Sequence, residues 1–208
     1  MSNYTLNKSQ WLFVFLAGLF ITNAVTAELI SNKLIEIPLN INLFGTELGP
    51  FVTIVGILPW PIVFLLTDLL NEFYGYKAVK RLSWITAILI AYCFIIVGLA
   101  IQIPAYEIEG SSLSDDYSFN KVFGQAQMVI VGSICAFLVS QLLDAVLFKW
   151  IKSKTGSKYI WLRSTGSTVV SQLIDSYIVL YIGFVLPGSL SFSDFMTIAP
   201  TNYILKHP

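Results

Sequence analysis

The sequence predicts an all-α integral membrane protein, a six-helix transmembrane bundle whose sixth helix is truncated in this chain. Composition is the first observation: of 208 residues, 56% are hydrophobic and only 12% are charged, whereas a soluble domain carries about 25% charged residues. The second is a series of five apolar stretches, each close to the roughly 20 residues that cross a bilayer as a helix. We therefore expect residues 1–208 to form a single transmembrane domain embedded in the lipid bilayer.

The expected helices follow one another with mostly short polar connections. They cover roughly residues 11–30, 51–71, 82–103, 126–148 and 168–186, and a sixth starts near residue 195. The chain ends at Pro208, so this last segment is expected to be too short to cross as a helix. Pro59 and Pro61 fall midway along the second stretch. A proline inside a helix removes a backbone hydrogen bond, which predicts a kink there.

The charges between the stretches predict their orientation. Basic residues occur before the first stretch and in two connections: Lys8; Lys77, Lys80 and Arg81; Lys149, Lys152, Lys154, Lys158 and Arg163. Acidic residues dominate the longest connection: Glu107, Glu109, Asp115 and Asp116, against Lys121. Because cytoplasmic loops are enriched in Lys and Arg, we expect a multi-pass protein of the inner (plasma) membrane with a cytoplasmic N-terminus.

The first stretch has a second interpretation as a cleaved signal peptide. Lys8, the apolar run 11–21 and the small residues around Ala27 resemble a basic region, an apolar region and a cleavage site. The apolar run continues past Ala27, and the alternation of charge needs this helix. A membrane helix is therefore the favoured interpretation.

Several functional classes receive no support from the sequence. Twelve Lys and Arg balance twelve Asp and Glu, so net charge indicates no nucleic-acid partner. Cys93 and Cys135 lie within apolar runs without metal-ligand spacing, and His207 is the only histidine. We therefore expect no catalytic residue, no metal and no cofactor. The chain has no ATP-binding motif, and a partner ATPase is not implied.

Two matching motifs place polar groups inside the membrane. Residues 140–144 read SQLLD and residues 171–175 read SQLID. In each motif the glutamine and the aspartate are three apart and share a helix face, which pairs Gln141 with Asp144 and Gln172 with Asp175. Charged side chains in hydrocarbon cost roughly 2.5–3.5 kcal/mol on insertion scales and commonly mark functional sites. The alternatives are hydrogen bonding between helices for packing and, for Asp144, an ion pair with Lys149.

Further polar residues lie on the first two stretches. Asp68 and Glu72 are four apart on one face at the end of the second stretch, beside Asn71. Pairing of these acids with Lys77, Lys80 or Arg81 is the alternative to a binding role. Asn23 lies deep enough in the first stretch to face a cavity, whereas Glu28 is expected near the outer surface. The candidate binding residues are Asp175, Gln172, Asp144, Gln141, Asp68, Asn71 and Asn23, with Asp175 ranked first because it lies nearest the membrane centre.

Three segments resemble the queuosine precursor transporter family, which belongs to a wider group of vitamin uptake proteins. They are residues 67–77 (TDLLNEFYGYK), residues 161–168 (WLRSTGST) leading into SQLID, and SQLLD at 140–144. Asn202, Tyr203 and Lys206 are similar to the entry to the family's last helix. The resemblance implies six helices and uptake of 7-cyano-7-deazaguanine or its aminomethyl relative, precursors of the modified tRNA base queuosine.

The polar residues suit such a small-molecule deazaguanine. A carboxylate accepts hydrogen bonds from adjacent N–H groups of a base edge, and a glutamine amide both donates and accepts. Trp60, Tyr74 and Tyr177 are candidates to stack on the ring, with ordinary packing as the alternative. The rival functions are transport of another vitamin-like or nucleobase-like solute, a structural or partner-binding membrane protein, and an intramembrane enzyme. The last would use Asp144 with Asp175 or a serine, for which no histidine partner is at hand.

Overall fold

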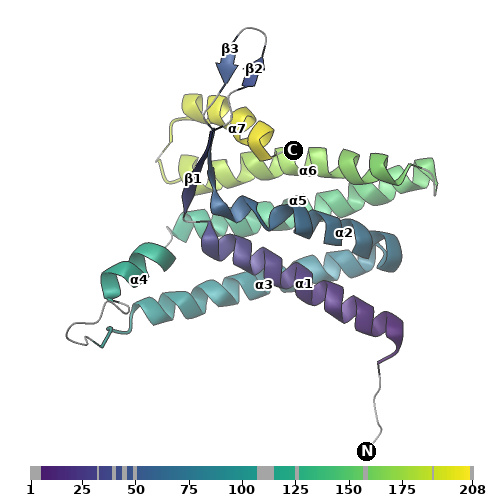
Figure 1. Ribbon diagram of the computed structural model, residues 1–208, viewed down its shortest axis with the longest axis horizontal. Coiled ribbons are helices and arrows are strands. Elements are labelled where there is room, and N and C mark those ends of the chain that lie inside the picture. Colours follow the sequence, from purple (N-terminus) through teal and green to yellow (C-terminus); the bar gives the residue numbers. More distant parts are fainter. Residues whose placement is uncertain are drawn as a thin grey trace, which may run out of the picture.

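The protein folds into a bundle of long helices, with a smaller β-structured segment and a short helix at one end (Figure 1). A computed structural model describes residues 6–31, 33–38, 41–43, 46–48, 51–106, 115–124, 127–156, 159–188 and 190–206. The helices are α1 (Lys8–Ile30), α2 (Trp60–Tyr74), α3 (Tyr76–Ile101), α4 (Asp116–Phe123), α5 (Gln127–Thr155), α6 (Ile160–Leu180) and α7 (Phe192–Lys206). A 3₁₀ turn, Val55–Ile57, precedes α2, and a π-helical turn, Tyr181–Val185, continues α6.

Five helical segments are long and apolar enough to cross a membrane within the described part of the chain. They are Lys8–Ile30, Val55–Tyr74, Tyr76–Ile101, Val129–Thr155 and Trp161–Val185. The predicted all-α membrane bundle is therefore confirmed. The sixth predicted segment corresponds to α7, which has 15 residues and contains Pro200. It packs against α6.

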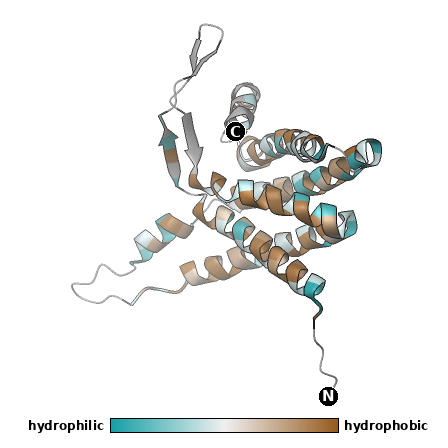
Figure 2. Ribbon diagram, turned by 45° about the vertical axis from the view of Figure 1, so that its right-hand side comes forward, coloured by the Kyte–Doolittle hydropathy of each residue, from teal (hydrophilic) through white to brown (hydrophobic). Residues whose placement is uncertain are grey.

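The distribution of side chains is that of a membrane protein. Large apolar residues face outward along α3, where Ile88 is 63% exposed and Ile95 is 61% exposed, while Thr86 on the same helix is fully buried. Figure 2 shows apolar residues along the sides of the long helices, with polar residues towards several of their ends. Water would solvate such a surface poorly, whereas a bilayer solvates it well.

The second predicted helix starts later than expected, and the kink is absent. Residues 51–54 form strand β4 (Phe51–Ile54), which pairs antiparallel with β1 (Leu34–Ile37). A second antiparallel pair joins β2 (Ile41–Leu43) and β3 (Thr46–Leu48). Pro59 caps α2 and Pro61 lies in its first turn. The prediction of a mid-helix kink was wrong because proline, with its fixed φ and missing N–H, also suits the first turn of a helix.

The central unit of the bundle is the antiparallel pair α5 and α6, which pack along much of their length. Gly156, with a φ of 63°, ends α5, and α6 starts at Ile160. The predicted start near residue 168 was eight residues too late, and residues 160–167, Arg163 among them, are helical. The α2–α3 connection at Gly75 lies at the same end of the bundle as the α5–α6 connection, on the right of Figure 1.

Candidate functional site

A cavity of about 430 Å³ lies between α2 and α6. The α2 side and the turn before it contribute Ile57, Trp60, Pro61, Phe64, Leu65 and Asp68, and α6 contributes Ser164, Thr165, Thr168 and Gln172. Its volume falls within the roughly 300–1,000 Å³ that is typical of small-molecule sites. The wall from α2 is mainly apolar and aromatic, and the wall from α6 is polar.

Asp68 is the carboxylate in this cavity. One oxygen, Oδ2, accepts a short hydrogen bond from the Ser164 hydroxyl. The other oxygen, Oδ1, is buried and has no hydrogen-bond partner among the described residues. A buried carboxylate oxygen without a partner is costly, and this atom is available to accept a further hydrogen bond.

Gln172 and two aromatic rings complete the cavity. Gln172 is 5% exposed, and its amide has no hydrogen bond within the described part of the chain. The rings of Trp60 and Phe64 stack on each other at 5.7 Å between centroids, with 23° between their planes. The cavity thus combines a pair of stacked aromatic rings with a carboxylate and an amide that can form further hydrogen bonds.

The other two aspartates join α5 to α6 through a reciprocal arrangement of the matching motifs. The Ser140 hydroxyl on α5 donates to Asp175 Oδ1 on α6 at 3.2 Å. The Ser171 hydroxyl on α6 donates to Asp144 Oδ1 on α5 at 3.4 Å, and Thr168 donates to the same oxygen at 3.2 Å. The serine of each motif therefore contacts the aspartate of the other, and we call this arrangement the α5–α6 clasp. Neither aspartate is among the residues that line the cavity.

The remaining candidates connect helices or bond within their own helix. Thr67 donates to Gln141 Oε1 at 3.0 Å, and Asn71 Nδ2 donates to the Ala145 carbonyl at 3.1 Å, so both join α2 to α5. Asn23 Nδ2 donates to the Leu19 carbonyl of its own helix at 2.8 Å. Of the seven candidates, the structure brings Asp68 and Gln172 to the cavity.

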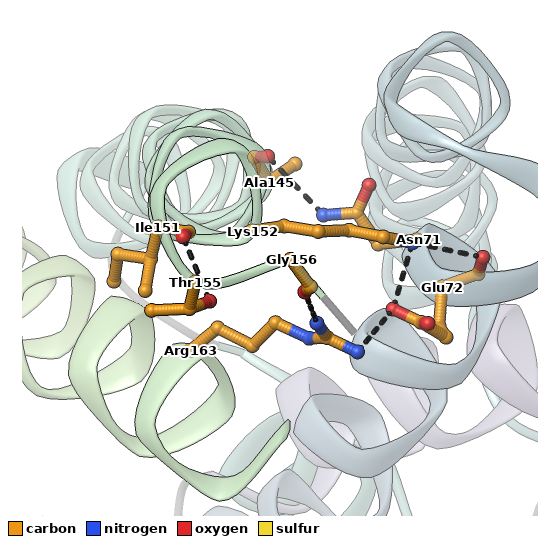
Figure 3. A network of polar contacts seen from close by, with 8 residues as sticks. All are labelled: Asn71, Glu72, Ala145, Ile151, Lys152, Thr155, Gly156 and Arg163. Carbon is orange, nitrogen blue, oxygen red and sulfur yellow. Dashed lines mark hydrogen bonds and ion pairs between the residues drawn. The ribbon is translucent and has the colours of Figure 1, made fainter. Parts of the chain in front are cut away.

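An ionic cluster lies near the end of α2, one helical turn beyond Asp68, and Figure 3 shows its contacts. Glu72 Oε2 is 2.9 Å from both Lys152 Nζ and Arg163 Nη2. Arg163 is 1% exposed, donates from Nη1 to the Gly156 carbonyl at 2.7 Å, and lies over the Phe148 ring. Glu72 thus pairs with cations of α5 and α6 rather than with Lys77, Lys80 or Arg81.

Other sequence interpretations are resolved by the contacts. Lys149 lies over the Tyr76 ring, 5.5 Å from its centroid, and is not the partner of Asp144. Glu28, in the last turn of α1, is buried and accepts a 2.5 Å hydrogen bond from Ser133 of α5, so it faces another helix at that end of the bundle. Tyr74 bonds the Ser9 carbonyl, and Tyr177 packs edge-on against Phe195. Trp60 is therefore the only one of the three proposed stacking residues that lines the cavity.

Seven cavity residues were not among the sequence-based candidates: Ile57, Pro61, Phe64, Leu65, Ser164, Thr165 and Thr168. Ser164 had a usable signal, because it lies within the 161–168 segment that carries the family resemblance. Its role depends on α6 starting early enough to place residue 164 opposite Asp68, and a hydropathy pattern alone does not reveal that start. His207 lies outside the described residues.

A membrane-spanning bundle that encloses a cavity with an aromatic wall and unsatisfied polar groups is typical of transporters for small solutes. The comparisons with known proteins agree. A model of the family described as "Putative vitamin uptake transporter" matches residues 54–207, and the chain belongs to this family. No solved structure matches the chain.

Three curated relatives are similar over most of the chain. A "Probable queuosine precursor transporter" of Bacillus subtilis (strain 168) is 30% identical over 162 residues, which cover 77% of this chain and 68% of the relative. One of the same name from Haemophilus influenzae is 26% identical over 162 residues, covering 74% of this chain and 63% of the relative. The "Queuosine precursor transporter" of Escherichia coli (strain K12) is 26% identical over 180 residues, covering 85% and 72%.

Proposed function

We propose that this chain imports a queuosine precursor, 7-cyano-7-deazaguanine or its aminomethyl relative, across the plasma membrane for tRNA modification. The cavity between α2 and α6 is its substrate site in this proposal. Family membership and the names of the relatives support the class of solute. The observation that carries the site is the buried, unpartnered Asp68 Oδ1, which lines the same cavity as the Gln172 amide and the Trp60–Phe64 wall.

The chemistry of the cavity suits a deazaguanine. Its guanine-like edge presents adjacent N–H donors, which a carboxylate accepts well. Asp68 Oδ1 takes one of these donors without breaking the Ser164 contact, and the Gln172 amide both donates and accepts at the rest of the polar edge. The flat ring stacks on the aromatic wall, an interaction worth about 1–3 kcal/mol per base in nucleic-acid complexes.

The proposal also assigns an orientation to the protein. The α2–α3 and α5–α6 connections, with the basic residues Lys77, Lys80, Arg81 and Lys154, face the cytoplasm, and so does the N-terminus. The end that carries α4 and the strands faces outward. The activity is passage of the solute without chemical change, with the side chains supplying binding groups rather than catalytic ones.

A complementation experiment tests this function. A bacterial strain that neither makes nor takes up queuosine precursors is supplied with this chain and fed each precursor at low concentration, and queuosine is then measured in its tRNA. We expect queuosine to return with the chain and to stay absent with an empty vector. Absence of queuosine in cells that carry the protein in their membrane would contradict the proposal, whereas suppression of the signal by excess guanine would widen the solute class.

A further inference from the structure

The ionic cluster of Glu72, Lys152 and Arg163 lies just beyond one end of the cavity. Asp68 and Ser164 line the cavity at this end. Glu72 follows Asp68 by one turn of α2, and Arg163 immediately precedes Ser164 on α6. The contacts show that α2 runs parallel to α5 and that α5 runs antiparallel to α6, so α2 and α6 are antiparallel. Glu72 and Arg163 therefore lie beyond the same end of the cavity.

The cluster ties three helices together at that point. One carboxylate oxygen of α2 lies 2.9 Å from a cation of α5 and 2.9 Å from a cation of α6. Lys152 also donates to the Glu72 carbonyl at 3.4 Å, and Arg163 donates to the carbonyl of Gly156, which ends α5. In Figure 3 the Arg163 and Lys152 side chains converge on Glu72 from separate helices. The Glu72 side chain is 24% exposed, whereas that of Arg163 is 1% exposed, so the cluster lies at the edge of the helix bundle.

The helices joined here differ in how firmly they are held. The α5–α6 clasp binds those two helices along their buried faces through Asp144 and Asp175. Across the cavity, α2 is joined to α6 by the Asp68–Ser164 hydrogen bond and the Glu72–Arg163 ion pair, and both lie at the same end. Separation of α2 from α6 at this end therefore requires loss of both the Glu72–Arg163 ion pair and the Asp68–Ser164 hydrogen bond, whereas the clasp, which joins α5 to α6, can stay intact.

We propose that Glu72, Lys152 and Arg163 form the gate that closes the cytoplasmic end of the cavity, and that they separate when the solute is released. This inference rests on the proposed transport function, but not on the identity of the solute. Arg163 supplies the buried anchor of the gate. Glu72 lies on α2 and moves with that helix, so both of its ion pairs break when α2 separates from α5 and α6.

The test measures access to the cavity from the cytoplasmic side. Gln172→Cys is the reporter, because this position is buried and lines the cavity. It is placed in a background with Cys93→Ser and Cys135→Ser. Inside-out vesicles are treated with a membrane-impermeant maleimide without any solute, and the labelling rate is compared with that of the denatured protein. We expect slow labelling of the reporter when the cluster is intact. With Glu72→Gln we expect the labelling rate to be about tenfold higher, because coupling between sites typically changes an equilibrium about 5- to 150-fold.

A charge exchange and a neighbouring lysine serve as controls. Glu72→Lys with Lys152→Glu moves the carboxylate to α5 within the same cluster, and we expect it to restore slow labelling. Lys149→Gln removes a cation of α5 that lies over Tyr76 and outside the cluster, so its labelling rate should stay at the parental value. Equal rates for Glu72→Gln and the parent would overturn the gate, and so would equal rates for the charge exchange and Glu72→Gln in monodisperse protein. Because no solute is present, such a result leaves the uptake experiment as the separate test of the proposed function.

Discussion

Asp68 and Asp175 are both carboxylates inside the bundle, yet their surroundings differ in one respect. Asp175 accepts a hydrogen bond from Ser140 on the neighbouring helix, whereas Asp68 has an oxygen without a partner and lines the cavity. Depth along the helix ranks Asp175 first. Depth does not separate the two residues, because the hydroxyl groups that satisfy a carboxylate come from another helix and leave no mark in its own segment.

The twin glutamines of the two motifs give a prediction at the residue scale. Gln172 lines the cavity, whereas Gln141 accepts a hydrogen bond from Thr67 in the interior. We expect Gln172→Ala to weaken binding of 7-cyano-7-deazaguanine about threefold to tenfold, because one neutral hydrogen bond is worth about 0.5–1.5 kcal/mol. Gln141→Ala should instead lower stability by about 1–3 kcal/mol and leave affinity unchanged. Calorimetric titration and detergent melting of both variants decide the matter, and the reverse pattern would place the site next to Gln141.

The hydropathy of the sequence predicts the positions of the long helices well, but not where two of them start. The apolar stretches indicated where the five long helices lie, because lipid-facing residues dominate them. The start of α6 was missed because Arg163 interrupts the apolar pattern. Its charge is compensated by partners that the local sequence does not reveal, above all Glu72 on α2. The start of α2 was missed because the apolar run 51–57 reads equally well as a helix, although it forms a strand and a 3₁₀ turn.

The α5–α6 clasp gives a prediction at the scale of elements. Ser140→Ala removes the hydroxyl that donates to Asp175, and we expect it to lower the free energy of unfolding by about 1 kcal/mol, near the value for hydrogen bonds between membrane helices. Ser153→Ala is the matched control, because this exposed serine of the same helix donates to the Trp150 carbonyl within its own helix and makes no hydrogen bond to another helix among the described residues. Unfolding is followed in mixed detergent and denaturant. A loss of stability in Ser153→Ala as large as in Ser140→Ala would contradict the clasp.

The whole molecule is a bundle of apolar helices with a cavity between α2 and α6. The sequence predicts the orientation from charge alone, and the structure groups the basic connections at the end that carries the ionic cluster. We expect Tyr106→Cys, 87% exposed beyond α3, to react with an impermeant thiol reagent added outside intact cells. Lys154→Cys, exposed at the end of α5, should react only after the cytoplasmic side is opened. The opposite pattern would invert the protein in the membrane.

The central claim is that the α2–α6 cavity binds the solute through Asp68, and one binding measurement tests it most directly. Purified, monodisperse Asp68→Asn, Asp144→Asn and Asp175→Asn are titrated with 7-cyano-7-deazaguanine beside the wild type. Each substitution keeps the size of the side chain and replaces an acceptor oxygen with a donor. Loss of one partner of a buried charged pair costs about 2–5 kcal/mol, so we expect Asp68→Asn to bind roughly 30-fold or more weakly. Asp144→Asn and Asp175→Asn should melt at lower temperature but keep affinity close to that of the wild type. Wild-type affinity in Asp68→Asn, with the loss in Asp144→Asn or Asp175→Asn instead, would contradict the account and move the site to the α5–α6 interface.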